Sequence, residues 1–223
     1  MARIIDISPA ITPSIAVWPG DTPFSQSWLC RLDQGSNLDL STITSTVHLG
    51  AHADGPSHYG LGAPGIGERA LEYYLGPCQV IHVDVEPGAR IQPEDLPGPI
   101  AAPRVLFGTG TFPDPNAWNT DFAALSPDLV DYLADRGVVL VGLDTPSVDL
   151  FADKELLSHH AIARRDLAIL EGLVLDHVPP GLYTLVALPL RIPGADASPV
   201  RAALVLGDWS DPEVGAEVET AER

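Results

Sequence analysis

Positive charge is scarce in this sequence. Twelve Lys and Arg side chains stand against thirty Asp and Glu in 223 residues, which gives a formal net charge of −18, and the single lysine is Lys154. A chain this acidic repels phosphate backbones and anionic lipid headgroups. The composition therefore argues against binding to nucleic acid or to a membrane surface.

Cysteines and long apolar runs are also few. Cys30 and Cys78 are too few for a disulfide framework and form no CxxC pair of the kind found in metal sites. No segment approaches the roughly twenty uninterrupted apolar residues of a membrane span. The N-terminus lacks the apolar run and cleavage site of a signal peptide. We therefore expect a cytoplasmic protein.

Two common catalytic signatures are missing as well. The sequence contains no GxSxG and no GxxxxGK[ST], which disfavours a serine hydrolase of the common type and a P-loop enzyme. The stretch "GLGAPG" matches GxGxxG in its letters. It follows a histidine-rich loop and contains Pro64, whereas a dinucleotide site needs a preceding strand.

Short β-branched runs between Pro- and Gly-rich turns dominate the chain. They predict strands within 3–8, 40–48, 78–86, 104–110, 137–145, 172–178, 181–190 and 199–207, and the alternation in 40–48 predicts one buried face. Helices are expected from Ser126 to Gly137, from Ala152 to Asp166 and, as a short third, within 67–76. The pattern indicates one strand-rich α/β domain over residues 1–207, followed by an acidic disordered tail at 208–223.

Three histidines and an aspartate crowd the stretch "VHLGAHADGPSHYG". His48, His52, Asp54 and His58 lie at offsets 0, 4, 6 and 10. The glycines and Pro56 disfavour a helix, whereas even offsets put all four side chains on one side of an extended chain. Imidazoles with a carboxylate suit zinc, with manganese or iron as alternatives. We therefore predict a catalytic metal site here.

A second group of candidate ligands comes later in the chain. His159, His160 and Glu171 are its members, and Glu171 lies in an apolar run, where a carboxylate is costly to bury unless it is paired or bound to metal. An exposed glutamate is the competing interpretation. Trp18 precedes Pro19 and is therefore held extended; it either packs on the core or offers an aromatic wall to a ligand.

Taken in order, these segments resemble a known family. "STVHLGAHADGPSHY" is similar to the HxGTHxDxPxH signature of the metal-dependent cyclase-like amidohydrolases, and within that superfamily the chain most resembles the bacterial kynurenine formamidases. "WPGDTPF", "GLDTPSVD", "HHAIARRDLAILEGLVLDHVPPG" and "DASPVRA" support the resemblance, which runs from about residue 4 to 205. Two departures are Ala51, where the family usually has threonine, and Gly55, where many relatives have alanine.

The resemblance implies a swivelling β/β/α fold, a homodimer and two divalent metal ions per subunit, most often zinc, with manganese as the alternative. Its later ligand pair is a histidine twelve residues before a glutamate, which selects His159 and not His160. The implied roles are His48, His52, Asp54, His159 and Glu171 as metal ligands, with both carboxylates bridging, His58 as the acid/base group, and Trp18 stacking on the substrate.

The implied activity is hydrolysis of N-formyl-L-kynurenine to L-kynurenine and formate, a step of tryptophan degradation, by water activated between two metal ions. The partner would then be a small aromatic formamide. One alternative is another hydrolase on the same scaffold, such as an isatin or cyclic-amide hydrolase. The other is a protein that binds metal without catalysis.

Overall fold

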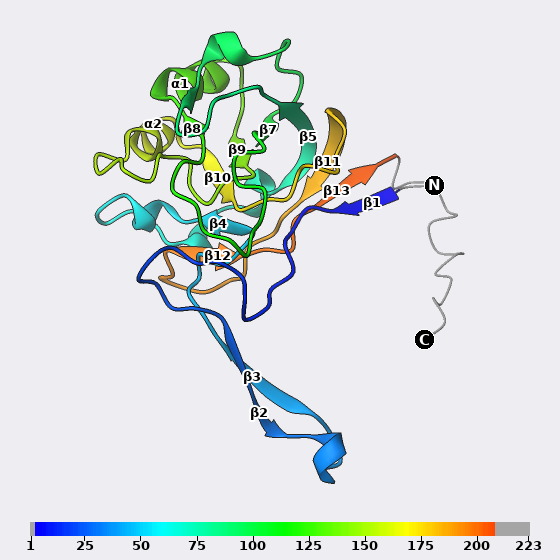
Figure 1. Ribbon diagram of the computed structural model, residues 1–223. Coiled ribbons are helices and arrows are strands. Elements are labelled where there is room, and N and C mark those ends of the chain that lie inside the picture. The colour runs from blue at the N-terminus through cyan, green and yellow to red at the C-terminus, as the bar shows by residue number, and fades with distance from the viewer. Residues whose placement is uncertain (1–2, 208–223) are drawn as a thin grey trace.

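The computed structural model describes residues 3–207 (Figure 1). Its main feature is a nine-stranded mixed sheet in the order β1-β13-β11-β5-β7-β9-β10-β4-β12. Strands β5, β7, β9 and β10 run parallel, and the other neighbours are antiparallel. The strands are β1 (Arg3–Asp6), β13 (Ala203–Leu206), β11 (Gly181–Val186), β5 (Leu75–His82), β7 (Arg104–Gly108), β9 (Leu140–Leu143), β10 (Ala168–Glu171), β4 (His52–Asp54) and β12 (Ala197–Pro199).

Smaller elements complete the molecule. Two further pairs are β2 (Ser25–Cys30) with β3 (Leu40–Thr44), and β6 (Arg90–Ile91) with β8 (Ala124–Leu125). The α-helices are α1 (Pro127–Ala134) and α2 (Leu157–Arg165). Within residues 3–207, no helix has the length and apolar character needed to cross a membrane. The predicted strand-rich α/β class is confirmed, whereas the predicted tail at 208–223 lies outside the described residues.

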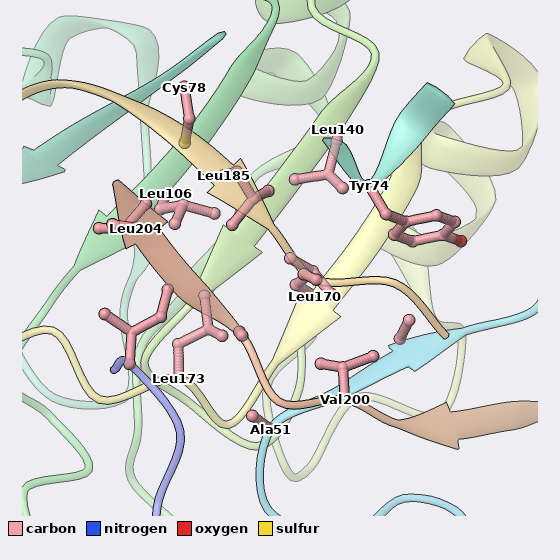
Figure 2. Close-up of a cluster of buried hydrophobic side chains, with 14 of the residues drawn as sticks. Ala51, Tyr74, Cys78, Leu106, Leu140, Leu170, Leu173, Leu185, Val200 and Leu204 are labelled. Carbon is pink, nitrogen blue, oxygen red and sulfur yellow. The ribbon is translucent and has the colours of Figure 1, made fainter. Parts of the chain in front are cut away.

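The core is divided by the parallel strands into two apolar clusters. Successive side chains of a strand point to opposite faces, so in β7 Leu106 enters one cluster and Phe107 the other. The first cluster lies within the curl of the sheet and gathers side chains from many strands, among them Leu140, Leu170 and Leu204 (Figure 2). The second lies beneath α1 and α2. Helices therefore cover one face of the central strands.

The prediction of a buried face for residues 40–48 is wrong. The strand is β3, and every residue of Leu40–Thr44 is exposed. It pairs only with β2, and the resulting hairpin projects away from the body of the molecule (Figure 1). Alternation in the sequence predicted the strand, but no other element within residues 3–207 covers either of its faces.

The structure confirms the first predicted helix, shortens the second and does not contain the third as an α-helix. Ser126 caps α1 as expected, since its side chain accepts a hydrogen bond from the Leu129 amide. The helix predicted from residue 152 begins only at Leu157. Residues 67–76 form two single turns of 3-10 helix and the start of β5, and the strand predicted at 172–178 is a loop that follows β10. In the last case the chain turns at Gly172, which has a positive φ of 65°.

Candidate metal centre and active site

Strand pairing brings three candidate ligands together: His52, Asp54 and Glu171. In the antiparallel register of β4 with β10, Glu171 lies opposite His52 and Ile169 lies opposite Asp54. His52, Asp54 and Glu171 therefore share the helix-covered face, while Ala53 points to the opposite cluster. All three ligand candidates are almost completely buried.

A close backbone approach permits this pairing. A Cβ atom at Gly172 would lie 2.2 Å from the carbonyl oxygen of Gly50, so only glycine fits where the chain leaves β10. The same Gly50 carbonyl lies 2.9 Å from Nδ1 of His52. That contact makes Nδ1 the donor nitrogen and directs the bare Nε2 toward Glu171, whose Oε2 is 3.2 Å away.

The histidine-rich stretch is not one extended strand, contrary to the prediction. Only His52–Asp54 is a strand, His48 lies in the bend before it, and His58 ends a 3-10 turn. The turn follows Gly55, where a Cβ would lie 2.5 Å from the backbone nitrogen of Ile66. Glycine at residue 55, where many relatives have alanine, therefore fits the tight backbone contact in this chain.

Helix α2 supplies the fourth candidate from the opposite side. His159 is 3% exposed, and its Nε2 lies 3.5 Å from Oδ2 of Asp54 and 3.8 Å from Oε1 of Glu171. The neighbouring His160 is exposed. One helical residue turns the side chain by about 100°, so the two histidines cannot both face the cluster.

The donor set leaves buried atoms that a bound cation would satisfy. Within residues 3–207, Nε2 of His52, Nε2 of His159 and both carboxylate oxygens of Asp54 are buried without a hydrogen-bond partner. Buried polar groups without partners are rare in native proteins. Two overlapping groups could hold a metal ion, and they share Asp54: His48–Asp54–His58 and His52–Asp54–Glu171. The residues present therefore fit divalent cations.

Charges in the cluster depend on one another. Burial opposes protonation of His48, but Asp54 and Asp196 outweigh it and raise the pKa of His48 to about 9. Burial also disfavours the His159 cation, yet Asp149 and Asp54 raise the pKa of His159 to about 10. Against the burial cost, the neighbouring imidazoles of His159 and His48 lower the pKa of Asp54 well below its ordinary value. Without metal, the imidazoles of His48 and His159 are therefore protonated at neutral pH.

Two carboxylates contact the histidines from outside, and sequence reasoning assigned no role to either. Oδ2 of Asp196 lies 3.1 Å from Nε2 of His48 and 3.5 Å from Nδ1 of His58, and Asp149 contacts His159. Both lie in quoted motifs, "DASPVRA" and "GLDTPSVD". Neither motif indicates which histidine its aspartate contacts.

A cavity of about 550 Å³ opens onto the cluster. His48, His58 and Glu171 line it, and so do Trp18 and Trp118. The Trp18 ring packs edge-on against Trp118, with 5.2 Å between ring centroids. Trp18 therefore packs among aromatic neighbours and also forms part of the cavity wall, so both interpretations left open by the sequence describe it.

Ala51 has no contact with the cluster. Its methyl group lies in the first apolar cluster (Figure 2), on the face of β4 opposite His52. The hydrogen bond that orients His52 comes from the Gly50 carbonyl. The orientation of His52 therefore does not depend on the side chain at residue 51.

Comparisons with known proteins show which family and fold this chain shares. The family model described as "Putative cyclase" matches residues 5–150. A kynurenine formamidase of Bordetella petrii is 48% identical over 206 residues, which are 92% of this chain and 98% of the relative. A solved "potential metal-dependent hydrolase with cyclase activity" superposes with a TM-score of 0.79 at 26% identity, over 93% of this chain and 100% of that one. Isatin hydrolase A from Labrenzia aggregata shares the fold, with a TM-score of 0.79 at 22% identity over 93% and 94% of the two chains.

Proposed function

Since this chain belongs to the cyclase family of metal-dependent hydrolases, we propose that it hydrolyses N-formyl-L-kynurenine to L-kynurenine and formate. The observation that carries the proposal is 48% identity to kynurenine formamidases over nearly their whole length. The enzyme is thus a hydrolase that acts on a linear amide bond, and the substrate is a small aromatic formamide. A metal-binding protein without catalysis is disfavoured by the same similarity.

The buried cluster is the proposed binding site for two divalent metal ions, with zinc as the first choice and manganese as the second. Sharing of Asp54 between two candidate groups supports two ions, and mixed imidazole and carboxylate donors suit zinc. Bound cations would polarise a carbonyl oxygen and lower the pKa of water toward 7. The proposed ligands are His48, His52, Asp54, His159 and Glu171.

His58 is the proposed acid/base group. The reaction releases an aryl amine, which leaves readily only if its nitrogen receives a proton. His58 lines the cavity, its side chain is 35% exposed, and its Nδ1 lies 3.5 Å from Asp196. An accessible imidazole can hold and deliver that proton.

Trp18 is the proposed contact for the aromatic ring of the substrate. Its indole lines the same cavity as the imidazoles, and Trp118 and Phe151 hold it, with ring centroids 5.2 and 5.1 Å away. Offset or edge-on packing of a second aromatic ring is favourable by about 1 kcal/mol. The wall therefore favours an aromatic formamide over an aliphatic one.

Comparing substrates tests the proposed activity. The purified, zinc-loaded chain should have a higher kcat/KM for N-formyl-L-kynurenine than for isatin or a cyclic amide. A preference for isatin would overturn the formamidase proposal and favour the alternative of a different hydrolase on this scaffold.

Zinc affinity should rise with pH. At pH 7 the metal-free imidazoles of His48 and His159 carry protons, because their pKa values are about 9 and 10. Binding through Nδ1 of His48 and Nε2 of His159 must displace one proton from each, so below pH 9 the affinity falls as the pH falls. Calorimetry of zinc binding in buffers of different ionisation enthalpy should detect release of at least two protons per chain, since, against the cost of burial, Glu171 and Asp54 also raise the pKa of His52. Binding without proton release would contradict the proposed ligands.

Homodimer formation stays a prediction of the resemblance, and a cytoplasmic location stays a prediction from the sequence alone. The same holds for the absence of nucleic-acid and membrane partners, which rests on the net charge of −18. Size-exclusion chromatography with light scattering on the full chain measures the oligomeric state directly.

A further inference from the structure

The carboxylate of Asp149 is buried beneath His159 and does not belong to the proposed set of metal ligands. Its side chain is 1% exposed. Oδ2 accepts from the backbone nitrogen of His159 at 3.0 Å and lies 2.8 Å from Nδ1 of the same residue. Oδ1 accepts from the backbone nitrogen of Ser158 at 2.9 Å and from Nη1 of Arg90 at 2.8 Å. Four donors thus converge on the four lone-pair sites of one carboxylate.

This arrangement decides which nitrogen of His159 is free. Because the carboxylate only accepts, Nδ1 of His159 must carry the proton it donates. Nε2 is then the nitrogen that can present a lone pair, and it is the buried atom without a partner that faces Asp54 and Glu171. At His52 the backbone carbonyl of Gly50 has the same effect.

Arg90 holds the carboxylate in place. Besides Asp149, its Nη1 donates to the carbonyl of Leu125 at 2.6 Å and to Oγ of Ser158 at 2.8 Å, and its Nη2 donates to Asp153. The guanidinium therefore ties β6 and β8 to the start of α2. Asp149 cannot rotate away from His159 without losing its hydrogen bonds from Arg90 and from the backbone amides of Ser158 and His159.

We infer that Asp149, held by Arg90, is a positioning residue that aims Nε2 of His159 at the metal site. The inference rests on the proposed function in one respect, that His159 is a metal ligand. Carboxylates that accept from the second nitrogen of a ligating histidine fix its orientation and raise its basicity, and their loss weakens metal binding about 10- to 100-fold.

A purely structural role is the competing explanation, and Asp153 provides the matched control. Its Oδ1 accepts from the amides of Glu155 and Leu156, at 2.8 and 3.2 Å, and its Oδ2 pairs with Arg90. Asp153→Asn thus removes a carboxylate from the same helix start and from the same arginine. Among the described residues, no hydrogen bond or ion pair joins Asp153 to His159.

The test is zinc affinity by competition with a chromogenic chelator on metal-stripped full chains, without substrate. Asp149→Asn should weaken the affinity for one zinc ion about 10- to 100-fold. Asp153→Asn should leave the affinity for both zinc ions within about threefold of wild type. Introducing Asp149→Asn into a His159→Gln chain should cause no further loss, because the carboxylate acts through that imidazole. Equal weakening by the two Asn variants, or wild-type affinity in Asp149→Asn, would overturn the inference.

A second variant covers the case in which Asp149→Asn does not fold. Asp149→Glu keeps the charge opposite Arg90 but displaces the oxygens by one methylene, so it should fold and still weaken one zinc ion; unchanged affinity would again overturn the inference. Failure of the proposed activity can be distinguished from failure of this inference. A wild-type chain that binds two zinc ions but does not hydrolyse N-formyl-L-kynurenine would overturn the formamidase proposal, whereas the zinc affinities of the Asp149 variants would still test the inference.

Discussion

Replacement of His58 by alanine should lower kcat for N-formyl-L-kynurenine by about 10²- to 10⁴-fold, the usual contribution of a positioned acid/base group. The aryl amine needs a proton as the C–N bond breaks, and His58 is the exposed imidazole at the cavity, with its ring centroid 4.3 Å from that of His48. Because His58 is not a proposed ligand, two zinc ions should remain bound. Steady-state kinetics and elemental analysis on the same sample measure both quantities.

His160→Ala is the matched control, since this histidine is exposed on α2 and does not line the cavity. Its activity should stay within about twofold of wild type. Near-normal turnover by metal-loaded His58→Ala would show that another group delivers the proton. Loss of a zinc ion from His58→Ala would make His58 a ligand, as the grouping of His48, Asp54 and His58 allows.

Asp54→Asn should have a larger effect on the metal site than any other single change. Oδ1 of Asp54 lies 3.1 Å from His48 and 3.5 Å from His52, and Oδ2 lies 3.5 Å from His159. An amide keeps the shape but removes the charge and one acceptor oxygen. Both zinc ions should therefore be weakened, and kcat/KM should fall by about 10³-fold or more, which corresponds to about 4 kcal/mol of lost stabilisation.

Asp131→Asn provides a control for this variant, because Asp131 pairs with Arg165 on the surface. Its side chain is 39% exposed and does not line the cavity. Zinc content and kcat/KM of this control should match wild type. An Asp54→Asn chain that retained two tightly bound zinc ions would contradict the bridging role of Asp54.

The sequence could predict the fold class because alternation and apolar runs are local properties. It predicted strands that overlap β5, β7 and β9, which the structure shows to be parallel, and it predicted the cap of α1 at Ser126. It could not show that β2 and β3 stand clear of the body, because burial of a strand face depends on what packs against it. Nor could it show that the chain turns at Gly172, which has a positive φ, and forms a loop where a strand was predicted over 172–178.

Candidate ligands were recognisable in sequence because histidine and carboxylate are rare in apolar surroundings. The twelve-residue spacing selected His159, the histidine that the structure buries beside Glu171, while His160 is exposed. The outer contacts could not be predicted. Asp149 and Asp196 meet their histidines through loops whose course depends on the whole sheet, and nothing in their neighbouring residues encodes those contacts.

The central claim, metal-dependent hydrolysis of an aromatic formamide, is tested most directly by one measurement. Hydrolysis of N-formyl-L-kynurenine by the purified chain is followed before metal stripping, after stripping, and after zinc is restored. The account predicts that activity falls by about 10³-fold or more on stripping and returns with zinc. Full activity in the stripped chain, or none in the zinc-loaded chain, would contradict it.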